Sequence, residues 1–284
     1  MIGRLPRVTE EETIPARSNL ALLLREPGAR RRIAELLSRP DCNRPAFQPI
    51  YSLETGHVVG YEAFSRFAAQ PVRPPDRWFA EATQVGLGAQ LQAMAIRQIL
   101  AIAGDAGLPD GAFLSLNVSP RYLSDPTIVQ AFAAVEPRRL VVEITEEEPV
   151  ADYRAVRAAM QPYLEHGVRF AVDDAGAGFA SMRHITELRP AYVKLDADLV
   201  RGMSSRETLQ AFLRALNGFA RETGAVLVAE GVENLADLAA LIATGFPLLV
   251  QGYAIARPGA PWPSVSRGAQ AAWHEVTAHP PAGG

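Results

Sequence analysis

The stretch Val168-Arg-Phe-Ala-Val-Asp-Asp-Ala-Gly-Ala-Gly178 joins a β-prone run to two adjacent carboxylates and a loop of alanines and glycines. Two neighbouring aspartates at a strand end repel each other, so the pair is unfavourable unless a cation compensates it. A divalent metal ion is the usual compensator, and glycine lets backbone and ligand approach closely. The alternative is an ordinary turn that closes a strand, and this stretch alone does not decide between the two.

Composition and charge describe an ordinary globular chain. Its 284 residues are 48% hydrophobic and 21% charged, with a formal net charge of −3. That charge excludes the global basic field used for sequence-independent binding of DNA or RNA polymers, but not a compact anionic ligand neutralised locally. Cys42 is the one cysteine, so no intrachain disulfide forms. Without a signal-peptide core or a membrane-length apolar run, the chain is predicted to be cytoplasmic, with no membrane contact.

Strand-like and helix-like segments alternate through the middle of the chain. Runs rich in Val, Ile, Leu, Phe and Tyr predict strands at Ala46–Leu53, His57–Phe67, Phe113–Val118, Leu140–Thr145, Val168–Asp173, Tyr192–Leu195, Val226–Ala229 and Leu248–Gly252. The short turn Glu54-Thr-Gly56 suits a hairpin, so the first strand is expected antiparallel to the second. Helices are expected to begin at Asp152, at Ser204 or Ser205, and at Asn234.

Eight strands alternating with helices predict an α/β fold, a TIM-like (β/α)8 barrel with an antiparallel first strand. The competing fold is an open doubly wound sheet, which is weakened because no dinucleotide fingerprint follows the first strand. Three regions are expected. They are an N-terminal leader over 1–44 with one helix near 28–38, the barrel over 45–260, and a flexible C-terminal tail over 261–284.

Polar side chains occur at or near the ends of strands two to eight, where the chemistry of such barrels lies. They are Glu62, Asn117, Glu143, Asp173, Asp174, Lys194, Glu230 and Gln251. Any one of them could simply meet solvent, but so many carboxylates within apolar contexts would be costly to bury without cations. Oxygen ligands without His or Cys favour Mg²⁺, Mn²⁺ or Ca²⁺, and the aspartate pair could hold two ions roughly 3.5–4 Å apart.

Eight short blocks of the sequence, taken in order, resemble those of a known family. The blocks in order are Gln48-Pro-Ile, Glu62-Ala-Phe-Ser-Arg66, Asn117-Val-Ser119, Glu143-Ile-Thr-Glu146, Asp173-Asp-Ala-Gly-Ala-Gly178, Val193-Lys-Leu-Asp196, Ala229-Glu-Gly-Val-Glu233 and Gln251-Gly-Tyr253. Over roughly residues 45–260 they resemble the EAL-domain family of bacterial phosphodiesterases, which hydrolyse the second messenger cyclic di-GMP to linear pGpG. The resemblance also implies a barrel with an antiparallel first strand.

The resemblance implies a role for each matching residue. Glu62, Asn117, Glu143 and Asp173 resemble ligands of a first Mg²⁺ or Mn²⁺ ion. Asp173 would also bridge to a second ion held by Asp174, with Glu230 near that ion or its waters. Lys194 and Gln251 resemble groups that orient and help deprotonate the attacking water.

Four further residues resemble groups that contact the substrate or the catalytic loop. Arg66 resembles an arginine that grips a substrate phosphate, and Gln48 matches a position near the guanine. Glu146 and Glu233 resemble anchors of the catalytic loop. Relatives commonly pair near that loop, so a homodimer is expected.

The sequence departs from the family pattern at two places. Phe64 replaces leucine in the signature tripeptide, and Ala175 and Ala177 stand where the family commonly has Phe and Thr. A lost Thr hydroxyl removes a hydrogen bond worth roughly 0.5–1.5 kcal/mol, which could loosen the loop over 173–178. The main alternative function is a receptor that binds cyclic di-GMP or a protein partner without hydrolysis. A more distant one is a magnesium-dependent lyase or enolising barrel.

Overall fold

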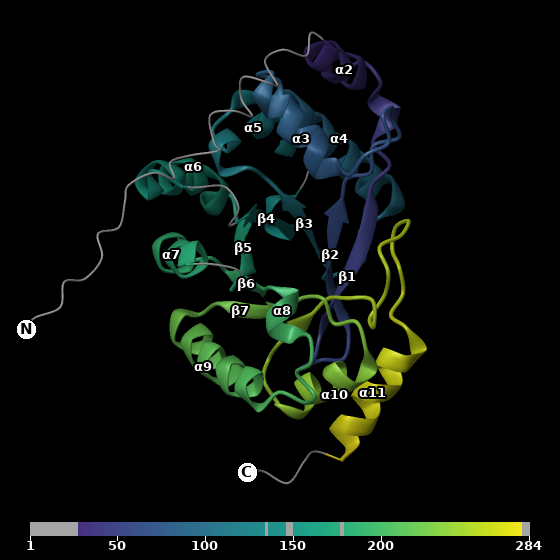
Figure 1. Ribbon diagram of the computed structural model, residues 1–284, viewed down its shortest axis with the longest axis vertical. Helices are drawn as coiled ribbons and strands as arrows, with labels where there is room; N and C mark the ends of the chain where they lie inside the picture. Colours follow the sequence, from purple (N-terminus) through teal and green to yellow (C-terminus); the bar gives the residue numbers. More distant parts are fainter. Residues whose placement is uncertain (1–27, 134–135, 146–149, 177–178, 280–284) are drawn as a thin grey trace, which may run out of the picture.

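The computed structural model describes residues 28–133, 136–145, 150–176 and 179–279. Within these ranges eight strands close into a barrel in chain order, and helices surround it (Figure 1). The first strand pairs antiparallel with both the second and the eighth, while the remaining neighbours are parallel. The predicted barrel and its hairpin entry are both confirmed.

Every strand of the barrel overlaps one of the predicted strands. Their bounds are β1 (Ala46–Ser52), β2 (Val58–Phe64), β3 (Phe113–Asn117), β4 (Leu140–Thr145), β5 (Arg169–Ala175), β6 (Tyr192–Leu195), β7 (Val226–Ala229) and β8 (Leu249–Val250). The largest departure is at β2, which ends at Phe64 although the prediction extends to Phe67. The last strand, β8, is only two residues long, and the Gln251 N–H that follows it still donates to the Ala229 carbonyl of β7 at 2.9 Å.

The helices that surround the barrel are α2 (Gly28–Leu37), α3 (Pro75–Gln84), α4 (Gly88–Ala106), α5 (Pro126–Phe132), α6 (Tyr153–Glu165), α7 (Phe179–Leu188), α8 (Ala197–Val200), α9 (Glu207–Thr223), α10 (Leu235–Ala243) and α11 (Arg267–Ala278). Asp152 and Asn234 cap α6 and α10, as predicted. The expected start of α9 at Ser204 or Ser205 is wrong. The backbone N–H of Ser204 donates instead to Asp237, and α9 begins at Glu207. None of the described helices has the length and apolarity needed to cross a membrane.

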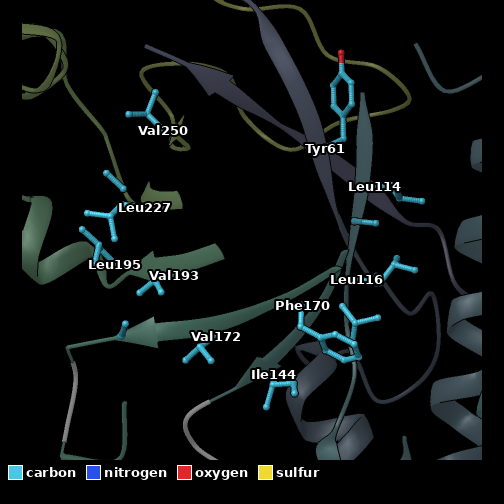
Figure 2. Packing of buried hydrophobic residues seen from close by; sticks show 14 of the residues in the cluster. Tyr61, Leu114, Leu116, Ile144, Phe170, Val172, Val193, Leu195, Leu227 and Val250 are labelled. Carbon is cyan, nitrogen blue, oxygen red and sulfur yellow. The ribbon is translucent and has the colours of Figure 1, made fainter. Parts of the chain in front are cut away.

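Side-chain alternation along the strands separates an apolar outer layer from an inner one, which is apolar at the N-terminal end of the barrel, around Phe113 and Val141, and polar at the C-terminal end. Side chains two residues apart lie on the same face of a strand. On β4, for example, Val142 and Ile144 belong to the core between barrel and helices, whereas Glu143 belongs to the interior set. Figure 2 shows members of this outer core on three successive strands, including Leu116 of β3, Ile144 of β4 and Phe170 of β5. The helices therefore bury the apolar outer face, and the C-terminal part of the inward face is left for chemistry.

The two ends of the described chain both pack against the barrel domain. Ile33 and Leu36 of α2 are buried in a small cluster with Trp78 of α3. At the other end, the expected flexible tail is wrong for residues 267–278, which form α11. Ser266 caps this helix, and the indole N–H of Trp273 donates to the Leu53 carbonyl at 2.8 Å. The proline- and alanine-rich composition concealed these long-range contacts.

Asp237 ties the segment after α8 to α10, on the side of the barrel where those helices are neighbours (Figure 1). Its carboxylate accepts from the backbone N–H groups of Gly202 at 3.0 Å and Ser204 at 2.8 Å. Burial acts to raise the pKa of Asp237, but these hydrogen bonds outweigh burial and lower it from 3.8 to about 2. The ionised form therefore stabilises the fold.

We predict that Asp237→Asn lowers the free energy of unfolding by about 2 kcal/mol at neutral pH. Because the folded pKa lies below the unfolded one, this contribution is complete above about pH 4 and disappears as the pH falls toward 2. Urea unfolding of both proteins between pH 3 and 7 measures the difference. A difference that stays constant across this range would contradict the role given to the carboxylate.

Candidate metal centre

The barrel brings the predicted polar residues together at the C-terminal rim of its parallel strands. Glu62, Asn117, Glu143, Asp173 and Lys194 occupy inward positions on β2, β3, β4, β5 and β6. Glu230 and Gln251 directly follow β7 and β8. Each of these residues has a described contact with another member of the group. The sequence prediction that these strand ends share one site is therefore confirmed as an arrangement in space.

The ammonium of Lys194 is the centre of this group. Its Nζ lies 3.1 Å from Glu62 Oε2, 2.7 Å from Glu143 Oε2, 2.9 Å from Asp173 Oδ1 and 2.7 Å from Glu230 Oε1. The residue is only 2% exposed. Lys194 is also the single lysine of the chain, whose other 27 basic residues are arginines. One compact cation therefore contacts carboxylates from four other strands or strand ends.

Amide and hydroxyl groups hold the carboxylates from the sides. Asn117 Nδ2 donates to Glu62 Oε1 at 3.1 Å, and the hydroxyl of Ser115 donates to Glu143. Gln251 Nε2 donates to Glu62 Oε2 at 2.9 Å and to Gln48 Oε1 at 3.1 Å. Such bonds fix the directions in which the remaining oxygen lone pairs point.

The charges at the site do not balance. Burial raises the pKa of Glu143 well above its usual range, and the neighbouring Glu62 raises it further. Burial also raises the pKa of Glu230 to about 8, against the lowering effect of Lys194. For Lys194, burial lowers the pKa, but the surrounding carboxylates outweigh burial and raise it well above its usual value. The ammonium therefore stays charged, yet one positive charge is too little for the carboxylates around it.

The aspartate pair at the end of β5 adds a second group of oxygen atoms. Asp174 has a φ of 55°, a left-handed conformation that aspartate tolerates better than most residues. Its backbone N–H donates to Asp173 Oδ1 at 3.1 Å. Asp173, Asp174 and Glu230 each place a carboxylate oxygen within 4.8 Å of the others. The turn therefore puts both aspartates beside Glu230 and not on opposite sides of the strand.

These residues fit a divalent cation on three grounds. The donors are oxygens, they carry excess negative charge, and several converge on one point. In addition, Gln251 Oε1 is buried and has no hydrogen-bond partner among the described residues. A buried acceptor of this kind suits a water held at the site.

Two cavities border the site and meet at Phe64. The first, of about 410 Å³, includes Arg66, Asn117 and Glu143 in its lining. The second, of about 380 Å³, is lined by both aspartates, Lys194, Glu230 and Tyr253. Phe64 lines both, so the residue that departs from the family tripeptide separates the two spaces.

Glu146, a predicted anchor of the catalytic loop, lies outside the described residues. Glu233 lines the second cavity, and its described ion pair is with Arg201 at 3.5 Å. Gln48 lines it too, although its amide groups are already engaged with Gln251 and the Ala256 carbonyl.

Sequence reasoning missed two functional candidates. Ser115 has the same inward parity on β3 as Asn117, and that signal could have identified it. Tyr253 is half exposed at the second cavity, with the guanidinium of Arg257 4.2 Å from its ring centroid. No local pattern predicts that contact.

The chain is similar to known proteins both in sequence and in fold. The sequence model of the EAL domain matches residues 30–258. An uncharacterized signaling protein of Caulobacter vibrioides is 31% identical over 87% of the chain and 30% of that relative. Cyclic di-GMP phosphodiesterase PdeL of Escherichia coli is 28% identical over 76% of the chain and 62% of that relative. The chain thus spans between about a third and two thirds of the length of these curated relatives.

Solved structures agree with the fold. A standalone EAL protein from Vibrio cholerae O395, in its c-di-GMP-bound form, superposes with a TM-score of 0.69 and 27% identity, over 79% of this chain and 95% of that one. Klebsiella pneumoniae BlrP1, in a complex with calcium and cyclic di-GMP, gives a TM-score of 0.68 and 25% identity, over 90% and 70% of the two chains. On the family match and on this agreement of fold, the chain belongs to the EAL domain family.

Proposed function

We propose that the chain is a metal-dependent phosphodiesterase that hydrolyses cyclic di-GMP to linear pGpG. The observation that carries the proposal is the convergence of a full oxygen donor set around Lys194, with a surplus of negative charge. Similarity to PdeL and to structures with bound cyclic di-GMP supports this choice of substrate.

The residues suited to holding cations fall into two overlapping sets. Glu62, Asn117, Glu143 and Asp173 would hold one Mg²⁺ or Mn²⁺ ion, and Asp173, Asp174 and Glu230 would hold a second. When bound, such a pair supplies positive charge that lowers the pKa of a water and neutralises phosphate oxygens. Similarity to BlrP1, solved with calcium and with manganese, supports a divalent requirement.

The protein groups around the donors have separate tasks in the proposed reaction. Lys194 would hold the attacking water by hydrogen bonding and favour its loss of a proton, because the ammonium stabilises nearby negative charge. The unpartnered Gln251 Oε1 would accept a hydrogen bond from that water and orient it. Attack on phosphorus then breaks one ester bond, and the 3′-oxygen takes up a proton as the ring opens.

The two cavities offer space for the two halves of the substrate. Arg66 lies in the lining of the first cavity and is exposed, so its guanidinium is available to a phosphate. Tyr253 presents a half-exposed ring to the second, where a guanine could stack. Gln48, being committed to Gln251, would act mainly by positioning that residue.

The proposal also covers the cellular location of the protein and its oligomeric state. A cyclic di-GMP phosphodiesterase acts on an intracellular messenger, which agrees with a single cysteine that is buried and free. We propose a cytoplasmic location and a homodimer, and sedimentation of the full chain at micromolar concentration tests the assembly.

We predict that the chain converts cyclic di-GMP to pGpG in Mg²⁺ or Mn²⁺, and that Asp173→Ala lowers the rate on the order of 100-fold or more. The reason is that removing a direct metal ligand costs more activity than the 10- to 100-fold loss typical of residues that only hydrogen-bond to a ligand. Chromatography of the nucleotides in Mg²⁺, Mn²⁺ and Ca²⁺ measures the reaction. Asp110→Ala, the same change at an exposed position, is the matched control and keeps full activity.

Two outcomes would count against the proposal in different ways. Tight binding of cyclic di-GMP with no pGpG at saturating Mn²⁺ would make the chain a non-catalytic receptor. Equal rates for Asp173→Ala and the wild-type chain would refute the metal assignment.

We further predict that Lys194→Met destabilises the metal-free protein by about 3–5 kcal/mol, because the buried carboxylates lose their one counter-charge. Thermal unfolding in EDTA measures the loss, and Mn²⁺ is expected to raise the Tm of this variant more than that of the wild-type chain. Arg201→Met is the control, since it removes an exposed cation from Asp198 and Glu233 and changes stability by less than about 1 kcal/mol. Equal losses in the two variants would show that Lys194 does not compensate the site.

A further inference from the structure

A third cavity, of about 370 Å³, lies at the opposite end of the barrel from the carboxylates. It is bounded by the turn between β1 and β2, by the first residues of β3, β5 and β6, and by α9. Its polar lining residues include Glu54, Arg169, Tyr192, Asn217 and Arg221. In barrels of this kind the N-terminal end usually serves stability, so polar groups there require their own explanation.

Arg169, the first residue of β5, presents an unbalanced charge to this cavity. Its guanidinium carbon lies 5.1 Å from the Phe113 ring centroid and 5.2 Å from that of Tyr192, and Nη1 donates to the Tyr192 hydroxyl. No carboxylate forms an ion pair with it in the described part of the chain. The aromatic rings fix the position of a half-buried cation that lacks a counter-ion, an arrangement suited to binding an anion.

Asn217 on α9 is a second, independent signal. The residue is 8% exposed and lines the cavity, yet its side-chain amide has no hydrogen-bond partner among the described residues. The amide is not among the fully buried side-chain atoms that lack a partner, so it faces the space of the cavity and is available to an occupant. Arg221 follows one helical turn later and adds an exposed guanidinium at the rim. Glu54, the carboxylate of the lining, is exposed and leaves a net positive charge among these groups.

Apart from Ser52 and Thr55, the rest of the lining is without polar side chains and includes Val59, Ala220, Pro247 and Leu249. We propose that this cavity binds a small organic anion, whose phosphate or carboxylate pairs with Arg169 and Arg221 and whose apolar body lies against Pro247 and Leu249. The site is separate from the one proposed for hydrolysis and does not depend on that function. The volume falls within the range of small-molecule pockets, about 300–1,000 Å³.

Phenyl phosphate and benzoate are suitable probes, with inorganic phosphate and phenol as half-probes for the charge and the ring. Titrations of the full ¹⁵N-labelled chain are followed by NMR in EDTA, so that no metal attracts the anions to the other end. We expect saturable shifts at residues 54–55 and 217–221, with Kd below about 1 mM for one of the two complete probes and weaker binding of both half-probes. Which complete probe binds more tightly distinguishes a phosphate from a carboxylate ligand.

Arg169→Gln and Asn217→Leu are each expected to raise Kd about tenfold or more. Arg214→Gln, on the exposed part of α9 outside the cavity, is the matched control and leaves Kd unchanged. Should Arg169→Gln fail to fold, Arg221→Gln at the exposed rim replaces it. No saturable shifts up to 10 mM, shifts confined to the carboxylate end, or a Kd that neither cavity variant changes would overturn the proposal.

Discussion

The contact between one ammonium and four carboxylates at the C-terminal rim is the interaction on which the functional end of the barrel depends. Lys194 reaches Glu62, Glu143, Asp173 and Glu230 at 2.7–3.1 Å. Four such acids could not be buried together without a counter-charge, since an uncompensated buried charge is strongly destabilising. The same contact leaves a negative surplus. The site is therefore stable enough to form and still attractive to divalent cations.

The choice of lysine at this position has a physical reason. The chain uses arginine at every other basic position, and Lys194 is its only lysine. An ammonium is a compact charge with three donors, whereas a guanidinium is a flat fork that suits bidentate partners. The four carboxylates approach from several directions around the barrel axis, so the compact ammonium fits among them better than a flat guanidinium. Arg169 shows the other use, since at the opposite end a planar guanidinium lies against two aromatic rings.

Much of the fold and of the site could be predicted from the sequence, because both are recorded in local patterns. Strands show alternation, turns carry glycine, and the carboxylates stand out against apolar neighbours. Glu143 and Asp173 can therefore be identified as site candidates from the sequence alone. The missing parts depend on contacts between distant segments. Trp273 of α11 reaches Leu53 across 220 residues, and the local composition of this segment does not indicate that contact. The pairing of Gln48 with Gln251 and the place of Asn217 in a cavity lining are equally invisible in a local window.

The central claim is that the carboxylate group around Lys194 holds divalent cations. Anomalous diffraction from crystals saturated with Mn²⁺ tests it most directly. The account predicts one peak bounded by Glu62, Asn117, Glu143 and Asp173, and a second beside Asp174 and Glu230, with Lys194 no longer contacting all four carboxylates. Crystals that show no manganese at these oxygens, with Lys194 still bonded to the four acids, would contradict it.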